Sequence, residues 1–325
     1  MSVRFTPLLV GALSLVGWIA ATSHADTIYV SDQSAGRVVQ FASNGAGSNF
    51  ANSGLNVPEG MAFDSSGNLY VANAGFMNNS ITKFTPGGVG SVFANTGLNN
   101  PLGLAIDKSG NVFVANLTDN NIEKFTPGGI GSVFASGLNQ PVGLAFDGAG
   151  NLYAGNAGNN TIMKFTPGGV GSVFASTGLN GPYGLAFDGT GNLFVVNSGD
   201  NSIMKFSPGG TGSLFSSGLP GGNAQGDEHG LAFDSAGNLY VATTGKFLLA
   251  KFTPDGVGSI FADFNGSAGD INSAEVVINP GLPAGSVSPV PLPPATITGL
   301  TVLGMLGLGQ LSLSFRRRKS LRQAL

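Results

Sequence analysis

The sequence predicts an all-β chain that forms a six-bladed β-propeller of four-stranded blades, followed by a C-terminal transmembrane helix. Three observations favour the propeller: a repeated unit, four short apolar runs in each unit, and an incomplete first unit that a late segment completes. Four antiparallel strands in about 40–45 residues is the size of a propeller blade. The unit recurs at steps of 43, 40, 41 and 40 residues, starting at Gly54, Gly97, Gly137, Gly178 and Gly218.

The four apolar runs of each unit read GLAFD, NLYVAN, SIMKF and GSVFA in their common forms. Alternating side chains, enrichment in Phe, Val, Ile and Tyr, and punctuation by Gly, Asn and Pro indicate strands rather than helices. The D-x-x-G-N and T-P-G-G segments between them are expected to be tight turns with Gly or Asn at positive φ.

The number of blades follows from the two ends of the repeat array. Residues 27–51 align with the last three strands of a unit but lack its GLAFD strand. Residues 273–279 (SAEVVIN) have the polarity pattern of that missing strand. If this late segment becomes the innermost strand of the blade that residues 27–51 begin, the ring closes with six blades and no unpaired sheet edge remains at the junction.

Residues that recur in every unit are interpreted first as architecture. The Asp of each D-x-x-G-N turn is expected to accept amides of its own turn, with calcium as the alternative, although each turn offers one carboxylate where calcium takes several. The Asn that ends the second strand, as at Asn73, is expected to cap the following loop. A ring of lysines either covers apolar surface with its stems or binds anions: Lys83, Lys124, Lys164, Lys205 and Lys251.

Composition excludes several classes of protein. Hydrophobic residues make up 42% and charged residues 10% of the chain, which excludes a charge-driven disordered protein. Cysteine is absent, which excludes disulfide scaffolds, thiolate-ligated zinc, iron–sulfur clusters and a thiol nucleophile. Six basic residues lie at the extreme ends, so the body carries 8 basic against 17 acidic side chains. Such a body repels phosphates, and no nucleic-acid partner is expected.

Residues 1–25 have the layout of a secretory signal peptide. Arg4 supplies the positive region, residues 8–21 the apolar region, and Ser23-His24-Ala25 the small residues of a cleavage site. We expect signal peptidase to cleave after Ala25. A buried N-terminal helix or an uncleaved anchor is the alternative.

The C-terminal end has a complementary layout. Residues 281–295 form a Pro/Gly/Ser linker, and residues 296–315 are an uncharged stretch long enough to span a bilayer as a helix. Residues 316–325 then form a basic tail that is expected to stay in the cytoplasm. Its cluster begins with Arg316, Arg317 and Arg318.

This order of linker, span and basic cluster resembles the PEP-CTERM family of bacterial sorting signals. The segment Val290-Pro291-Leu292-Pro293 looks like the Val-Pro-Leu-Pro variant of the motif before the helix. The resemblance implies cleavage by an exosortase-type membrane protease after export across the inner membrane, and release to the envelope or the medium. A plain C-terminal anchor is the alternative.

The repeat wording of residues 26–280, P-x-G-L-A-F-D-x-x-G-N-L-Y-V-A-N with a later I-x-K-F, resembles the NHL-repeat family of six-bladed propellers. It also resembles gluconolactonase- and strictosidine-synthase-like propellers. Gluconolactonase-like enzymes hold a divalent metal on the axis with acidic and amide side chains from the x position of P-x-G-L in several blades.

In this chain the residue at that position differs from blade to blade. Glu59 matches the ligand pattern, whereas Leu102, Val142 and Ala274, the expected sixth, cannot ligate a metal. The remaining two positions carry Tyr183 and His229. An insertion adds acidic residues beside His229, so the candidate pore-mouth ligand site is Glu59, Tyr183, Glu228 and His229.

Two functions remain open from the sequence. The first is a non-enzymatic, exported binding or scaffold protein without a cofactor, whose partners are extracellular polysaccharide or envelope proteins. The alternative is a metal-dependent lactonase-type hydrolase that holds a divalent cation in the pore through Glu59, with Tyr183 and His229. A Ser or Cys triad is disfavoured because the mature chain keeps a single His and no nucleophile motif.

Overall fold

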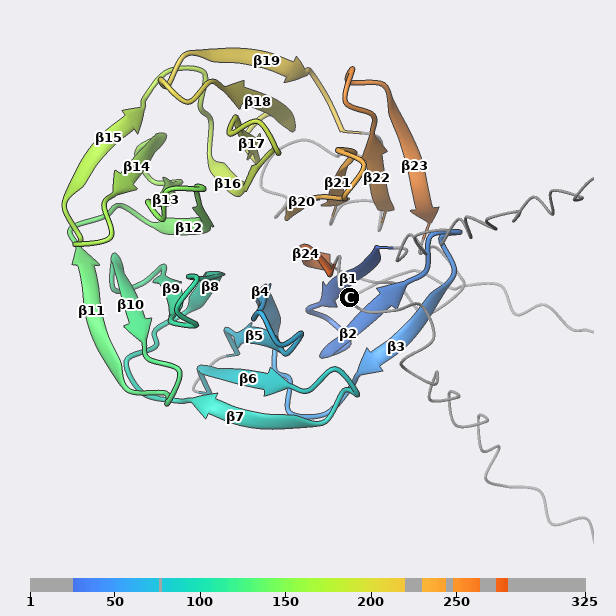
Figure 1. Ribbon diagram of the computed structural model, residues 1–325, viewed down its shortest axis with the longest axis vertical. Helices are drawn as coiled ribbons and strands as arrows, with labels where there is room; N and C mark the ends of the chain where they lie inside the picture. Colours follow the sequence, from blue (N-terminus) through green and yellow to red (C-terminus); the bar gives the residue numbers. More distant parts are fainter. Residues whose placement is uncertain (1–25, 76–77, 220–229, 244–247, 264–272, 280–325) are drawn as a thin grey trace, which may run out of the picture. The chain divides into compact units, whose positions relative to one another are not determined.

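Six four-stranded antiparallel sheets stand around a central axis in the computed structural model (Figure 1). The structure describes residues 26–75, 78–219, 230–243, 248–263 and 273–279. Within each sheet the strands follow one another from the axis to the rim, as the repeat predicts. The six-bladed propeller of four-stranded blades is therefore confirmed.

Five blades each consist of one repeat unit. The first has β4 (Pro58–Phe63), β5 (Leu69–Asn73), β6 (Ser80–Phe84) and β7 (Gly90–Ala94). The second has β8 (Pro101–Ile106), β9 (Val112–Asn116), β10 (Asn121–Phe125) and β11 (Gly131–Ser136). The third has β12 (Pro141–Phe146), β13 (Leu152–Asn156), β14 (Thr161–Phe165) and β15 (Gly171–Ala175). The fourth has β16 (Pro182–Phe187), β17 (Leu193–Asn197), β18 (Ser202–Phe206) and β19 (Gly212–Ser216). The fifth has β20 (Leu231–Phe233), β21 (Leu239–Thr243), β22 (Leu248–Phe252) and β23 (Gly258–Asp263).

The sixth blade, here called the closure blade, joins the two ends of the repeat array. Its strands β1 (Thr27–Asp32), β2 (Arg37–Phe41) and β3 (Gly47–Ala51) come from the start, and its innermost strand β24 (Ser273–Asn279) comes from the end. Figure 1 shows β24 beside β1 near the axis. The pairing matches Val30 with Val276 and Asp32 with Ser273, so the expected closure is confirmed.

Aromatic rings hold adjacent blades together. The second strand of each blade presents an aromatic side chain, and its ring meets a Phe of the outer strand of the same blade and often a Phe of the next inner strand. Tyr153, for example, packs edge-on against Phe174 and Phe187 with centroids 4.9 Å apart in both pairs. The same edge-on triple recurs around Phe113 and Phe194. Such pairs add about 0.5–1.5 kcal/mol each beyond the area they bury.

The repeated aspartates fasten their own turns, as expected. Asp147 Oδ1 accepts the amides of Ala149 and Asn151 at 3.0 and 2.8 Å, and its Oδ2 accepts Asn151 Nδ2 at 2.8 Å. Burial alone would raise the pKa of Asp147, but these hydrogen bonds and the charge of Lys164 together hold it below its usual value. These carboxylates are used by their turns, which favours architecture over calcium binding.

The lysine ring is likewise part of the blade. In five blades Lys Nζ lies 4.9–5.3 Å from the centroid of the strand-two ring, as Lys83 does over Tyr70. Lys83 Nζ also lies 3.5 Å from Asp64 Oδ2. In the closure blade uncharged Gln40 faces Tyr29, and uncharged Asn279 ends the inner strand where the other blades have Asp. The Lys charges therefore meet rings and carboxylates of their own blades.

The asparagines that end the second strands bind on two sides. Asn73 Nδ2 donates to Ser80 Oγ at 3.1 Å, across the following loop as expected, while the oxygen of the same side chain binds elsewhere. Asn73 Oδ1 accepts the amide of Asn56, which lies before the inner strand of the same blade, at 3.1 Å. Asn116 does the same for Asn99 at 3.2 Å. The expected cap on the following loop is confirmed at Asp32, whose Oδ1 accepts the amide of Ala35 at 3.2 Å. The contact of the Asn oxygens was not predicted, and it arises because the second strand ends beside the segment that arrives from the preceding blade.

Both expected terminal signals lie outside the described residues: the signal peptide (1–25), and the linker, span and tail (281–325). No helix among the described residues is long and apolar enough to cross a membrane.

Deleting residues 270–280 tests the closure of the ring. The deletion removes β24 with its fully buried Val276 and exposes an edge of β1. We expect the midpoint of thermal unfolding to fall by roughly 10 °C or more. The control is a chain that ends after residue 283 and keeps β24. Equal unfolding midpoints for the deletion variant and this control would contradict the closure of the ring.

Candidate functional site

The inner strands of all six blades line a cavity on the propeller axis. The cavity measures about 730 Å³, which lies within the ~300–1,000 Å³ usual for small-molecule sites. Its wall exposes polar and apolar surface in similar amounts. The apolar part comes largely from the residue after the motif glycine of each inner strand, which is an aliphatic or thioether side chain: Met61, Leu104, Leu144, Leu185, Leu231 and, in the closure blade, Val276. Here this space is called the axial funnel.

The other end of the axis is nearly closed. A void of about 10 Å³, the space of one water molecule, is lined there by Glu59, Leu102, Val142, Tyr183 and Glu275 together with neighbouring glycines. The x position of P-x-G-L is the second residue of its inner strand, and four of its side chains meet at this constriction. The structure thus brings together two of the four candidate ligand residues, Glu59 and Tyr183. The other two, Glu228 and His229, lie outside the described residues.

The motif glycines stand where neighbouring inner strands approach most closely. A Cβ atom at Gly60 would overlap the carbonyl oxygen of Leu102, and one at Gly103 would overlap that of Val142. These positions tolerate no side chain without movement of the next blade. Five of the six inner strands therefore carry Gly in this place.

The sixth inner strand carries a glutamate instead. In the first blade Pro58 pairs with Asn73 and Met61 with Val71; in the closure blade Ser273 pairs with Asp32 and Val276 with Val30. This register places Ala274 at the x position, as expected, and Glu275 at the position of the motif glycine. A Cβ atom at Gly230 would overlap Glu275 Oε1, so the glycine of the fifth blade makes room for this side chain.

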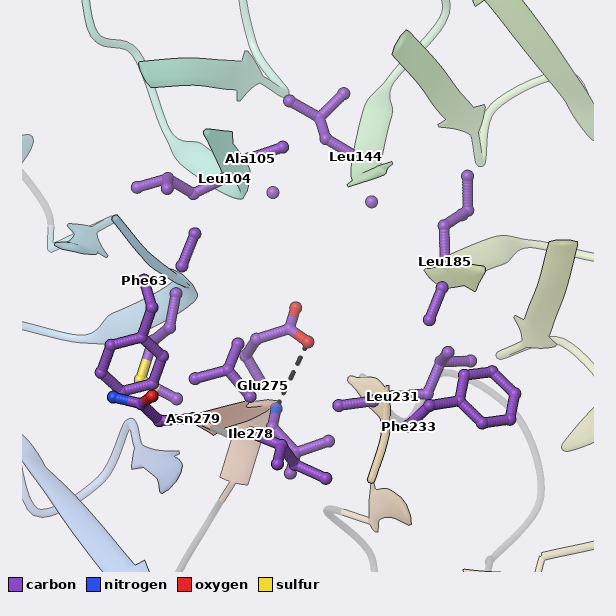
Figure 2. A pocket seen from close by; sticks show the side chains of 18 of the residues that line it. Phe63, Leu104, Ala105, Leu144, Leu185, Leu231, Phe233, Glu275, Ile278 and Asn279 are labelled. Atoms are coloured by element: carbon purple, nitrogen blue, oxygen red, sulfur yellow. Dashed lines mark hydrogen bonds between the residues drawn. The ribbon is translucent and has the colours of Figure 1, made fainter. Parts of the chain in front are cut away.

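The carboxyl group of Glu275 points into the axial funnel. Figure 2 shows it surrounded by Leu104, Leu144, Leu185 and Leu231, which come from four different blades. Its Oε1 accepts the amide of Val276 at 3.3 Å, and its own amide donates to Ser31 Oγ at 3.0 Å. Burial raises the pKa of Glu275 to about 8, and the Val276 hydrogen bond offsets only part of that shift. At neutral pH this residue is mainly an uncharged carboxylic acid.

Glu59 has a structural partner. Its side chain is 5% exposed, and its Oε1 accepts Gln33 Nε2 of the closure blade at 2.7 Å. This hydrogen bond links the first blade to the closure blade. Tyr183 is half-buried on β16 and lines the same void.

The described residues do not suit a hard divalent cation at this end of the axis. Such ions take several oxygen ligands, and the wall offers two carboxyl groups beside the apolar Leu102 and Val142. One of the two is Glu275, which prefers to keep its proton. In the described part of the chain no three His, Cys, Asp or Glu side chains gather in a way that could hold a metal ion.

Sequence reasoning missed Glu275. The available signal was the alignment of SAEV with the PEGM of the first blade, which sets Glu275 against Gly60. The short segment shares no motif residue with P-x-G-L, so only the pairing of β24 with β1 fixes this alignment.

No protein-family model matches the chain, and no curated protein matches its sequence. Solved structures do resemble it. A chain of a nidogen/laminin complex is 20% identical, with a TM-score of 0.68 over 78% of this chain and 98% of that one. A streptogramin B lyase is 15% identical, with a TM-score of 0.60 over 78% and 90% of the two chains. A putative gluconolactonase is 19% identical, with a TM-score of 0.52 over 62% and 76%. At these identities the likeness shows the propeller fold alone.

The raised pKa of Glu275 predicts how stability changes with pH. Between about pH 4.5 and 8 the unfolded chain ionises this group while the folded chain keeps the proton, so Glu275 lowers the free energy of unfolding as the pH rises. We expect Glu275→Gln to be more stable than wild type by about 2–4 kcal/mol at pH 9, allowing for the part of the side chain that faces channel water.

Urea unfolding of both proteins at pH 4 and pH 9 measures this difference, which should nearly vanish at pH 4. A glutamine variant that is no more stable than wild type at pH 9 would show that water in the axial funnel solvates the carboxyl group well.

Proposed function

We propose that this chain is an exported, non-enzymatic propeller that binds or organises material in the cell envelope or outside the cell. The observation that carries the proposal is the constriction at Glu59, Leu102, Val142 and Tyr183, which leaves room for about one water molecule. The resemblance to gluconolactonase-like enzymes implies that a metal and its lactone would bind at this end of the axis, beside the x positions of P-x-G-L. A sugar lactone needs far more space than that.

The protonation and hydrogen bonding of the carboxyl groups that could bind a metal ion support the same proposal. Glu59 accepts Gln33 Nε2, and Glu275 favours its uncharged form, so the carboxyl groups beside the void are poor ligands for a metal ion, which needs several oxygen ligands. A metal-dependent lactonase-type hydrolase is the second candidate, favoured by one observation: Glu59 and Tyr183, which lie 124 positions apart in the chain, line the same void.

Export and sorting rest on the terminal sequences. The signal peptide would begin translocation, and residues 296–315 would halt it, because placing the charges of 316–319 in hydrocarbon costs roughly 2.5–3.5 kcal/mol each. The linker would hold Val290 to Pro293 extended and open to an exosortase-type protease. These export and sorting signals favour extracellular polysaccharide or an envelope protein as the partner.

An assay of the purified full-length chain against a panel of sugar lactones tests the enzymatic alternative. With calcium, zinc or manganese added, we expect no turnover above the rate in buffer, because the constriction admits no substrate. The matched variant is Glu59→Gln, which keeps the shape of the side chain. Turnover in wild type that disappears in this variant would replace the binding function with the hydrolase.

Mass spectrometry of the protein accumulated by its native cells tests the sorting. We expect a mature form that begins near Asp26 and ends near residues 291–296. An intact tail through Leu325 on the accumulated product would leave a plain anchor and contradict protease sorting.

A further inference from the structure

The axial funnel has properties that neither a scaffold role nor the lactonase alternative requires. It opens at the end of the axis opposite the constriction, where the inner strands run into the D-x-x-G-N turns. Its wall reaches the turn residues Asp64, Ser65 and Ser66 of the first blade and Asn279 of the closure blade. A wide space lined by apolar side chains and a few polar groups, with a carboxyl group at its narrow end, is the general form of a small-molecule site.

We propose that the axial funnel binds a small organic cation, an apolar body with one ammonium group, and that the ammonium group pairs with the carboxylate of Glu275. This inference goes beyond the proposed function and does not depend on export or sorting. It rests on the shape of the funnel, on the place of Glu275 in it, and on the charges around it.

The place of Glu275 is the first argument. At this level of the inner strand five blades carry glycine, because a side chain there would press against the next inner strand; the closure blade alone carries a long side chain. Figure 2 shows the carboxyl group extended into the open space, in contrast to Asp64, whose oxygens are bonded to its own turn. A ligand that enters the funnel therefore meets this carboxyl group.

The charges around the funnel are the second argument. The titratable side chains along the two cavities are Glu59 and Asp64 from β4 and its turn, Tyr183 from β16, and Glu275 itself. All of them are acids, and no Lys, Arg or His occurs among the described residues of either wall. Asp64 is partly neutralised by Lys83 at 3.5 Å. No basic group of the described wall therefore favours an anion, and a cation that enters meets only acidic groups, of which Glu275 becomes charged when it gives up its proton.

The apolar wall decides which cation fits. The leucine side chains around Glu275 supply no ligand oxygen, so a bare metal ion at this carboxyl group would lose its water with little replacement. An organic cation keeps its apolar body against these side chains, where each Å² removed from water contributes about 25 cal/mol. Its ammonium group donates hydrogen bonds to Glu275, and the pair forms when the carboxyl group gives up its proton.

Calorimetric titration of the purified full-length chain tests the proposal with two rigid probes of equal shape, 1-adamantanamine and 1-adamantanol. At pH 9, where Glu275 is mainly ionised and an alkylammonium group keeps its proton, we expect the amine to bind wild type about tenfold or more tightly than it binds Glu275→Gln, since a hydrogen bond to a charged partner contributes about 1.5–3 kcal/mol. The alcohol should bind both proteins equally. Any uptake of probe by detergent is the same for the two proteins.

Proton release on wild type alone provides a second readout, which holds even if the variant fails to fold. Glu275 has its pKa raised to about 8, so at pH 7 it is mainly protonated and must lose that proton to pair with the amine. Titrations in buffers of different ionisation enthalpy should show close to one proton released per amine bound at pH 7 and little at pH 9.5.

Three results would contradict the binding of an organic cation at Glu275. Equal amine affinity in wild type and Glu275→Gln, amine binding without proton release, or no amine binding at all overturns the proposal. None of these results bears on the lactone assay, so the proposed function can stand or fall separately.

Discussion

The close approach of six inner strands around one axis is the constraint on which this structure depends. At the level of the motif glycine the backbone of one blade nearly touches the next, as between Gly60 and Leu102 or Gly103 and Val142. Only glycine fits such a gap without displacing a strand. This contact sets the width of the axis. It also explains why the constriction beside it holds about one water molecule while the funnel beyond it is wide.

Outside the axis, aromatic rings and charged side chains complete each blade. Tyr or Phe of the second strand fills the space between sheets, a lysine covers its outer face, and the turn aspartate accepts amides of its own turn, as Tyr153, Lys164 and Asp147 do in the third blade. The closure blade lacks the Lys and the Asp. Burial raises the pKa of its buried Tyr29 to about 12, and its ring packs against Phe50 and Phe63. The closure blade packs aromatic rings at this place and has its ion pair elsewhere, between Arg37 and the buried Asp32 at 2.8 Å.

The closure blade also departs from the repeat on the axis. Its inner strand comes from the far end of the chain and carries Glu275 in place of glycine. The same strand that closes the ring therefore brings the carboxyl group that faces the axial funnel. Burial raises the pKa of this group, which links the stability of the ring to the ionisation of Glu275.

The sequence by itself determined the number of blades, the four strands of each blade, the turns, and the place of Glu59 and Tyr183 near the axis. These features depend on short sequence patterns that recur in every repeat unit. Alternating side chains identify each strand, and Gly and Asn identify each turn. The tertiary structure decided which end of the axis is open, which loop the strand-ending asparagines bind, and where Glu275 lies. Nothing near SAEVVIN sets its register. That register comes from pairing with β1, more than 240 residues earlier, and a shift of one residue would turn Glu275 to the opposite face.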